Sequence, residues 1–114
     1  MKLAAYVLTV GMLACGHVQA EDVQALLQSY NCRLCHSAYE TRTGPAYVDV
    51  AAKYRGKKNA ASTIVAVIRK GVHGEGPWPM PPLPEVSPAD ARRIAEYILS
   101  LKPRATKASG TQGS

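Results

Sequence analysis

The chain has 114 residues, a formal net charge of +6, one tryptophan and no phenylalanine. This length allows one small domain and excludes a second domain with its own core, because no later hydrophobic run is long enough to form one. With so few large apolar side chains the core would be thin, and domains of this size often need a disulfide, a metal or a cofactor for stability.

Residues 1–20 have the layout of a secretory signal peptide. Lys2 supplies a positive start, an apolar stretch of about a dozen residues follows, and Ala20 precedes two acidic residues. We therefore expect cleavage after Ala20, export to the periplasm and no membrane span after processing, because a spanning helix needs roughly 20 apolar residues. A lipid anchor on Cys15 is the less favoured alternative, since the residues before it match the usual lipoprotein pattern poorly.

Two helices are predicted in the first half of the mature chain. The first begins at Asp22, with acidic residues where the helix dipole favours them, and leads directly into Cys32. The second begins at Gly44–Pro45, because proline suits the first helical turn, and ends near Gly56. Apolar residues recur at helical spacing in both, at Val23, Leu26, Leu27 and Tyr30 in the first and at Tyr47, Val50, Ala51 and Tyr54 in the second.

The third segment, residues 62–70, is ambiguous, because its β-branched run could also form a buried strand. Its ending favours a helix: Arg69 and Lys70 suit the negative end of the helix dipole, and Gly71 can adopt a left-handed cap. No second strand-like run exists to pair with this segment. We therefore predict a third helix here.

The fourth helix has the clearest start signal, with Ser87 as N-cap, Pro88 at the first helical position and Asp90 three residues after the cap. It ends before Pro103. The sequence thus predicts an all-α domain over residues 21–102, followed by a small, polar and basic tail at 103–114 that we expect to be disordered. The apolar face of this helix comprises Ala91, Ile94, Ala95, Ile98 and Leu101.

The segment from Cys32 to His36 is the C-x-x-C-H signature of haem attachment. Two thiols about one helical turn apart can bond the two vinyl groups of a single haem, and the next residue then lies beneath the iron. The sequence therefore predicts one covalent haem c, held through Cys32 and Cys35, with His36 as an axial ligand of its iron. The second ring nitrogen of His36 needs an acceptor that fixes its tautomer and orientation.

Two other uses of the cysteines are less well supported. A redox-active dithiol at Cys32 and Cys35 would normally lie beside a βαβ pattern, which is missing from this sequence. A zinc site would have to add His36 and His73, and the four ligands would then be awkwardly divided along the chain.

Met80 is the predicted sixth iron ligand. It is the only methionine left once residues 1–20 are removed, and it lies in a proline-rich loop from Pro77 to Pro82, where a residue used merely as core filler is uncommon. His73, in the same loop, is the alternative ligand. With His36 and Met80 both on the iron, no position is open for a substrate, so the protein would carry electrons and would not be an enzyme.

These motifs resemble the short class I cytochromes c of bacterial periplasms, which donate electrons to oxidases and to nitrite reductase. The resemblance covers residues 21–102 and implies the small cytochrome c fold, with four helices and loops wrapped around one covalently bound haem. It implies that the carbonyl group of Pro45 accepts a hydrogen bond from His36, and that Asn31 and Tyr97 lie where the first and last helices cross. It rests on Cys32 to His36, Thr43 to Tyr47, Asp49 to Tyr54, Pro79 to Pro82 and Tyr97 to Lys102.

One position departs from this family. Relatives typically place a tryptophan about five residues before the ligand methionine, where it can bond a haem propionate, whereas this sequence has Glu75 there. Its only tryptophan is Trp78, two residues before Met80. Trp78 would either pack on the haem edge or shield the loop.

We expect a monomeric periplasmic carrier that exchanges electrons with larger redox proteins such as a terminal oxidase, a nitrite reductase, a peroxidase or a dehydrogenase. The alternatives are a haem c subunit bound tightly to a periplasmic dehydrogenase, and a haem enzyme or sensor with an open iron site. Without Lys2, 13 of the 14 Lys and Arg remain against 8 Asp and Glu, a net charge of +5, and nucleic acid is not an expected partner of an exported protein. Either a docking patch for acidic partners or a simple solvated surface is formed by Lys53, Arg55, Lys57, Lys58, Arg69 and Lys70.

Overall fold

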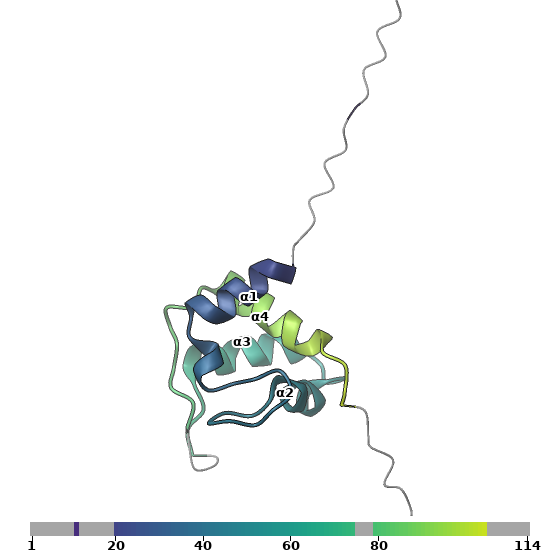
Figure 1. Cartoon of the computed structure of the whole chain (residues 1–114). Coiled ribbons are helices and arrows are strands. Elements are labelled where there is room, and N and C mark those ends of the chain that lie inside the picture. The colour runs from purple at the N-terminus through teal and green to yellow at the C-terminus, as the bar shows by residue number, and fades with distance from the viewer. Residues whose placement is uncertain (1–10, 12–19, 75–78, 105–114) are drawn as a thin grey trace, which may run out of the picture.

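The computed structural model describes Gly11 and residues 20–74 and 79–104. In these ranges the chain forms the helices α1 (Ala20–Ser29), α2 (Tyr47–Tyr54), α3 (Ala60–Lys70) and α4 (Pro88–Ser100), and a short 3₁₀ helix, η1 (Cys32–Leu34) (Figure 1). The extended pairing in the described part of the chain is a single antiparallel bridge between Val72 and Met80. The predicted all-α class with four helices is therefore confirmed. Among the same residues, no helix has the length and apolar character needed to cross a membrane.

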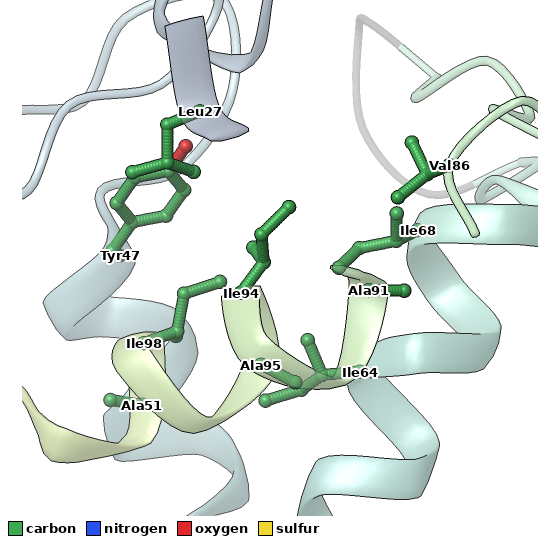
Figure 2. Packing of buried hydrophobic residues seen from close by; sticks show 10 residues of the cluster. All are labelled: Leu27, Tyr47, Ala51, Ile64, Ile68, Val86, Ala91, Ile94, Ala95 and Ile98. Atoms are coloured by element: carbon green, nitrogen blue, oxygen red, sulfur yellow. The ribbon is translucent and has the colours of Figure 1, made fainter. Parts of the chain in front are cut away.

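Helix α4 is the centre of the fold, because it packs against α1, α2 and α3 (Figure 1). Its buried face carries four of the five predicted residues, and Ile94 and Ile98 are only 2% and 4% exposed. Figure 2 shows these side chains between Leu27 and Tyr47 on one side and α3 on the other. Burying an isoleucine fully stabilises the fold by roughly 1.5–3 kcal/mol, so this face is a major source of stability. The cluster comprises Leu27, Tyr47, Ala51, Ile64, Ile68, Val86, Ala91, Ile94, Ala95 and Ile98.

Helix α2 begins at Tyr47, later than the predicted start at Gly44–Pro45. The reason is a long-range contact that the local sequence does not reveal. The amide of Tyr47 donates to the carbonyl oxygen of Ser37 at 2.9 Å, and the amide of Val48 donates to that of Ala38 at 3.1 Å. These bonds satisfy amides that a helix leaves without internal partners at its N-terminus, and they fasten α2 to the loop after the haem-attachment motif.

The β-branched segment is a helix, as predicted, and α3 begins two residues before the expected position. Its first helical residue follows Asn59, which has a positive φ of 60°. At the other end, Gly71 has the predicted positive φ, 74°, but its ψ of −179° is extended, so it is not a left-handed cap. The chain therefore leaves α3 in an extended direction and continues to the bridge at Val72.

Local capping signals correctly predicted the start of α4. The Ser87 side chain accepts a hydrogen bond from the amide of Asp90 at 3.1 Å, and Pro88 occupies the first turn. The helix ends at Ser100, before Leu101, whose backbone is extended. The Leu101 carbonyl oxygen then accepts a hydrogen bond from the Arg55 guanidinium at 2.5 Å, which ties the end of α4 to the end of α2.

The predicted terminal segments fall mostly outside the described residues. This holds for the signal peptide up to residue 19 apart from Gly11, including Cys15, and for residues 105–114 of the predicted tail. Arg104 is described, and its guanidinium donates to the carbonyl oxygen of Tyr39 at 2.6 Å and to the carboxylate of Asp49 at 3.1 Å. The chain just after α4 is thus fastened back onto the body of the domain.

Candidate functional site

The C-x-x-C-H motif lies on η1, directly after α1. The chain reverses at Asn31, whose φ of 58° and ψ of 23° are left-handed, and the amide of Cys35 then donates to the carbonyl oxygen of Cys32 at 3.3 Å. In a 3₁₀ turn the side chains at positions i and i+3 eclipse one another, so η1 places the two thiols on the same side. Asn31 is exposed, and its left-handed backbone turns the chain between α1 and η1.

Both cysteines are free thiols, Cys32 half-buried and Cys35 exposed. Burial raises the pKa of Cys32 above its ordinary value. The described residues contain no group of three or more His, Cys, Asp and Glu side chains that could hold a metal ion, so the zinc alternative finds no support in this part of the chain. Two free thiols, at Cys32 and Cys35, are the groups that covalent attachment of a porphyrin requires.

The His36 imidazole is held by three neighbouring residues. Its Nδ1 lies 2.7 Å from the carbonyl oxygen of Pro45. Since a carbonyl oxygen can only accept, Nδ1 carries the proton, and Nε2 is left with the lone pair that can bind a metal. The ring of Tyr47 stacks on the imidazole with 5.3 Å between centroids and 18° between planes.

Gly44 is the third neighbour, and it permits a close approach to the imidazole. A Cβ at this position would lie 2.7 Å from Nδ1 of His36 and 2.8 Å from Nε2, so any larger residue would overlap the ring. The Gly44 amide also donates to the carbonyl oxygen of Cys35 at 2.7 Å, which closes the loop between the motif and α2. Sequence reasoning predicted Gly44 only as a helix start and missed this role. The Gly44–Pro45 pair was the sequence feature that could have indicated a close approach to His36.

Tyr47 joins the site to the core. It is 5% exposed, packs in the cluster of Figure 2 and makes an edge-to-face contact with Tyr97 at 6.3 Å between centroids. Its hydroxyl is buried with no hydrogen-bond partner among the described residues, and burial raises its pKa. A cavity of about 260 Å³ beside these residues is lined in part by Leu27, Arg33, His36, Arg42, Tyr47 and Tyr97. The sequence predicted the burial of Tyr47 on one face of a helix but not its contact with His36.

Met80 is half-buried in an extended segment beside the end of α3. The amide of Val72 donates to the carbonyl oxygen of Met80 at 3.0 Å, and three residues after Met80 the amide of Leu83 donates to the carbonyl oxygen of Ile68 at 3.2 Å. His73 is exposed. Trp78 and Glu75, on which the predicted propionate contacts depend, lie outside the described residues.

Four of the six basic residues considered as either a docking patch or a solvated surface have contacts of two kinds. Arg55 donates to Leu101, as described above, and Nε of Arg69 donates to the carbonyl oxygen of Val86 at 3.0 Å. Both guanidinium groups thus have structural partners. In contrast, the ammonium groups of Lys53 and Lys57 are exposed and lie 5.4 and 5.6 Å from the centroid of the Tyr54 ring.

Comparisons with known proteins agree with this site. Residues 18–98 match the protein family described as "Cytochrome C oxidase, cbb3-type, subunit III". The chain is 44% identical to cytochrome c-551 of Stutzerimonas stutzeri over 93 residues, which cover 81% of this chain and 88% of that protein. It is 42% identical to cytochrome c-552 of Hydrogenobacter thermophilus over 82 residues, covering 69% and 81% of the two chains.

A solved structure shows the same fold. The crystal structure of wild-type Nitrosomonas europaea cytochrome c552 superposes with a TM-score of 0.66 at 42% identity, and the match covers 69% of this chain and 99% of that one. The cofactor of this family is a covalently attached haem c with iron, for which the paired free thiols and the oriented imidazole are suited. The chain therefore belongs to the small class I monohaem cytochromes c, which are electron-transfer proteins and not enzymes.

Proposed function

We propose that this cytochrome is a periplasmic one-electron carrier in which His36 and Met80 are the two axial ligands of the haem iron. The observation that carries the proposal is the 2.7 Å hydrogen bond between Nδ1 of His36 and the Pro45 carbonyl oxygen, because it leaves Nε2 available to a metal. Met80 supports the second half, since it is the only thioether in the chain after residue 20 and its backbone is fixed against α3.

Each residue of the site then has a defined task. Cys32 and Cys35 hold the haem covalently, which keeps it bound in both oxidation states. Pro45 and Tyr47 fix the orientation of the imidazole from two directions. When bound, the haem supplies a one-electron iron couple, and a methionine ligand raises its potential relative to a second histidine. With His36 and Met80 both bound to it, the iron would have no position for a substrate.

Replacing Met80 with alanine tests the axial ligation. The mature wild-type protein should have the far-red absorption band that arises from sulfur bound to ferric iron, and Met80→Ala should lose it while retaining the covalent haem. Replacing Met80 with histidine should also remove the band but leave a low-spin iron of lower potential. Persistence of the band in Met80→Ala, or its absence from the wild type, would contradict the assignment.

The proposed partners are larger redox proteins: a terminal oxidase, a nitrite reductase, a peroxidase or a dehydrogenase. A diffusing carrier should elute as a monomer when purified from native periplasm, whereas a haem c subunit of a dehydrogenase should co-purify with that enzyme. Rapid binding of carbon monoxide by the native reduced protein would instead support a haem enzyme or sensor with an open site. Mass spectrometry of the exported protein should show an N-terminus at Glu21, the added mass of one haem and no lipid.

A further inference from the structure

We propose that Gly71, the residue that ends α3, is the positioning residue for Met80: because it lacks a side chain, the backbone from Met80 to Pro82 can lie directly against the helix end. This inference rests on the proposed ligation of the haem iron by Met80. Gly71 would not touch the iron, but it would determine how firmly the Met80 thioether is held on the iron.

The backbone around Gly71 leaves no room for a side chain. A Cβ there would lie 2.6 Å from the carbonyl oxygen of Met80, 2.8 Å from the nitrogen of Pro82 and 2.9 Å from the carbonyl carbon of Pro81. All three are main-chain atoms, so none can swing aside as the end of a flexible side chain could. Ordinary contacts between a carbon and a carbonyl oxygen are about 3.3–3.6 Å long, so a methyl group at residue 71 would push the Met80 backbone away by roughly 0.7–1 Å.

The segment that carries Met80 cannot absorb such a shift easily, because hydrogen bonds hold it at this contact and just after it. At the contact, the amide of Val72 donates to the carbonyl oxygen of Met80, and after it the amide of Leu83 donates to the carbonyl oxygen of Ile68 on α3. Farther along, Arg69 donates to the carbonyl oxygen of Val86, a residue with no exposed surface. A displacement at Met80 therefore breaks or lengthens bonds that anchor the segment to the core.

Two other glycines provide matched controls. Gly56 and Gly74 also have positive φ, 77° and 84°, but a Cβ at either position would meet no atom of the described residues within 4 Å. Alanine at any of the three positions brings the strain of a positive φ. Alanine at residue 71 adds the collision with the Met80 segment, together with the strain of a positive φ combined with an extended ψ of −179°. The comparison with the controls is therefore made on ligand binding at the iron, which reports the hold on Met80, and not on stability.

The test uses the mature holoprotein, with imidazole as a competitor for the sixth position of the ferric iron. We expect Gly71→Ala to bind imidazole at least about tenfold more tightly than Gly74→Ala and Gly56→Ala, a modest effect for a displacement of nearly 1 Å at a reacting group. Its far-red sulfur-to-iron band should be weaker, and its reduction potential lower, than in either control. Equal imidazole affinities in the three variants would overturn the inference.

The failure of this inference and of the proposed function can be told apart. If the wild type lacks the sulfur-to-iron band, Met80 is not a ligand and the proposed function is wrong. If the wild type has the band but Gly71→Ala behaves as the controls do, only the positioning role is wrong. Should Gly71→Ala yield too little holoprotein, Val72→Pro removes the amide that donates to Met80, and the same imidazole comparison with Gly74→Ala decides.

Discussion

Replacing Gly44 with alanine would place a methyl group against the imidazole of His36. The new carbon would lie within 2.7–2.8 Å of both ring nitrogens, well inside an ordinary contact. The ring cannot turn away without cost, because Nδ1 is bonded to Pro45 and the ring of Tyr47 stacks on it. Either the imidazole is displaced or the loop before α2 moves.

Two effects should lower the stability of the Gly44→Ala protein. Overpacking of a tight site costs typically 1–3 kcal/mol, and loss of the hydrogen bond from His36 to Pro45 adds about 0.5–1.5 kcal/mol. We therefore expect Gly44→Ala to lower the free energy of unfolding of the holoprotein by roughly 2–4 kcal/mol.

Denaturant unfolding of the mature holoprotein, followed by far-ultraviolet circular dichroism, measures this loss. Gly56→Ala is the control, because a Cβ there meets no neighbour, and the loss for Gly44→Ala should clearly exceed it. The haem absorbance of Gly44→Ala should also show altered axial ligation below the unfolding transition. A variant with the wild-type midpoint and an unchanged haem spectrum would refute the claim that Gly44 is required for the packing around His36.

Two further predictions concern α4. Ser87→Ala removes the side-chain acceptor of the Asp90 amide and should lower the free energy of unfolding by about 1 kcal/mol, as loss of an N-cap usually does. Ser87→Asp keeps an acceptor and should retain most of the stabilisation. A denaturation midpoint of Ser87→Ala equal to that of the wild type would contradict the cap. Tyr30 donates to the carboxylate of Asp90 at 2.7 Å, and this hydrogen bond raises the pKa of Tyr30 above 10.0 in the folded state. The stabilisation is therefore complete below pH 10 and lost above it, so wild-type stability should fall more steeply than that of Tyr30→Phe as the pH rises through this range; parallel pH profiles would exclude the contribution.

Features controlled by neighbouring residues were predictable from the sequence. The cap at Ser87 and the apolar face of α4 each depend on a few adjacent positions, and the structure has both, whereas the left-handed cap expected at Gly71 was wrong because its ψ is extended. The attachment motif could be read in the same way, because two thiols and an imidazole within five residues are constrained by their spacing alone.

Features that depend on distant parts of the chain were not predictable. The late start of α2 follows from carbonyl groups at Ser37 and Ala38, which no helix rule includes. The sequence assigns Arg69 to an exposed patch, whereas its hydrogen bond to Val86 exists only because residues 80–86 return along α3. The close approach of the Met80 backbone to Gly71 was not predictable for the same reason, because it depends on how the two segments lie in space.

The central position of α4 has a consequence for the order in which this protein can fold. Helices α1, α2 and α3 all pack on the last of the described helices in chain order, so none of them can complete its apolar contacts before residues 91–98 are in place. Contacts between α1 and α4 also close a loop of more than half the chain, which slows folding relative to a bundle of sequential neighbours. A truncation that removes α4 should therefore deprive α1, α2 and α3 of the apolar contacts with their common partner, and the domain should not fold.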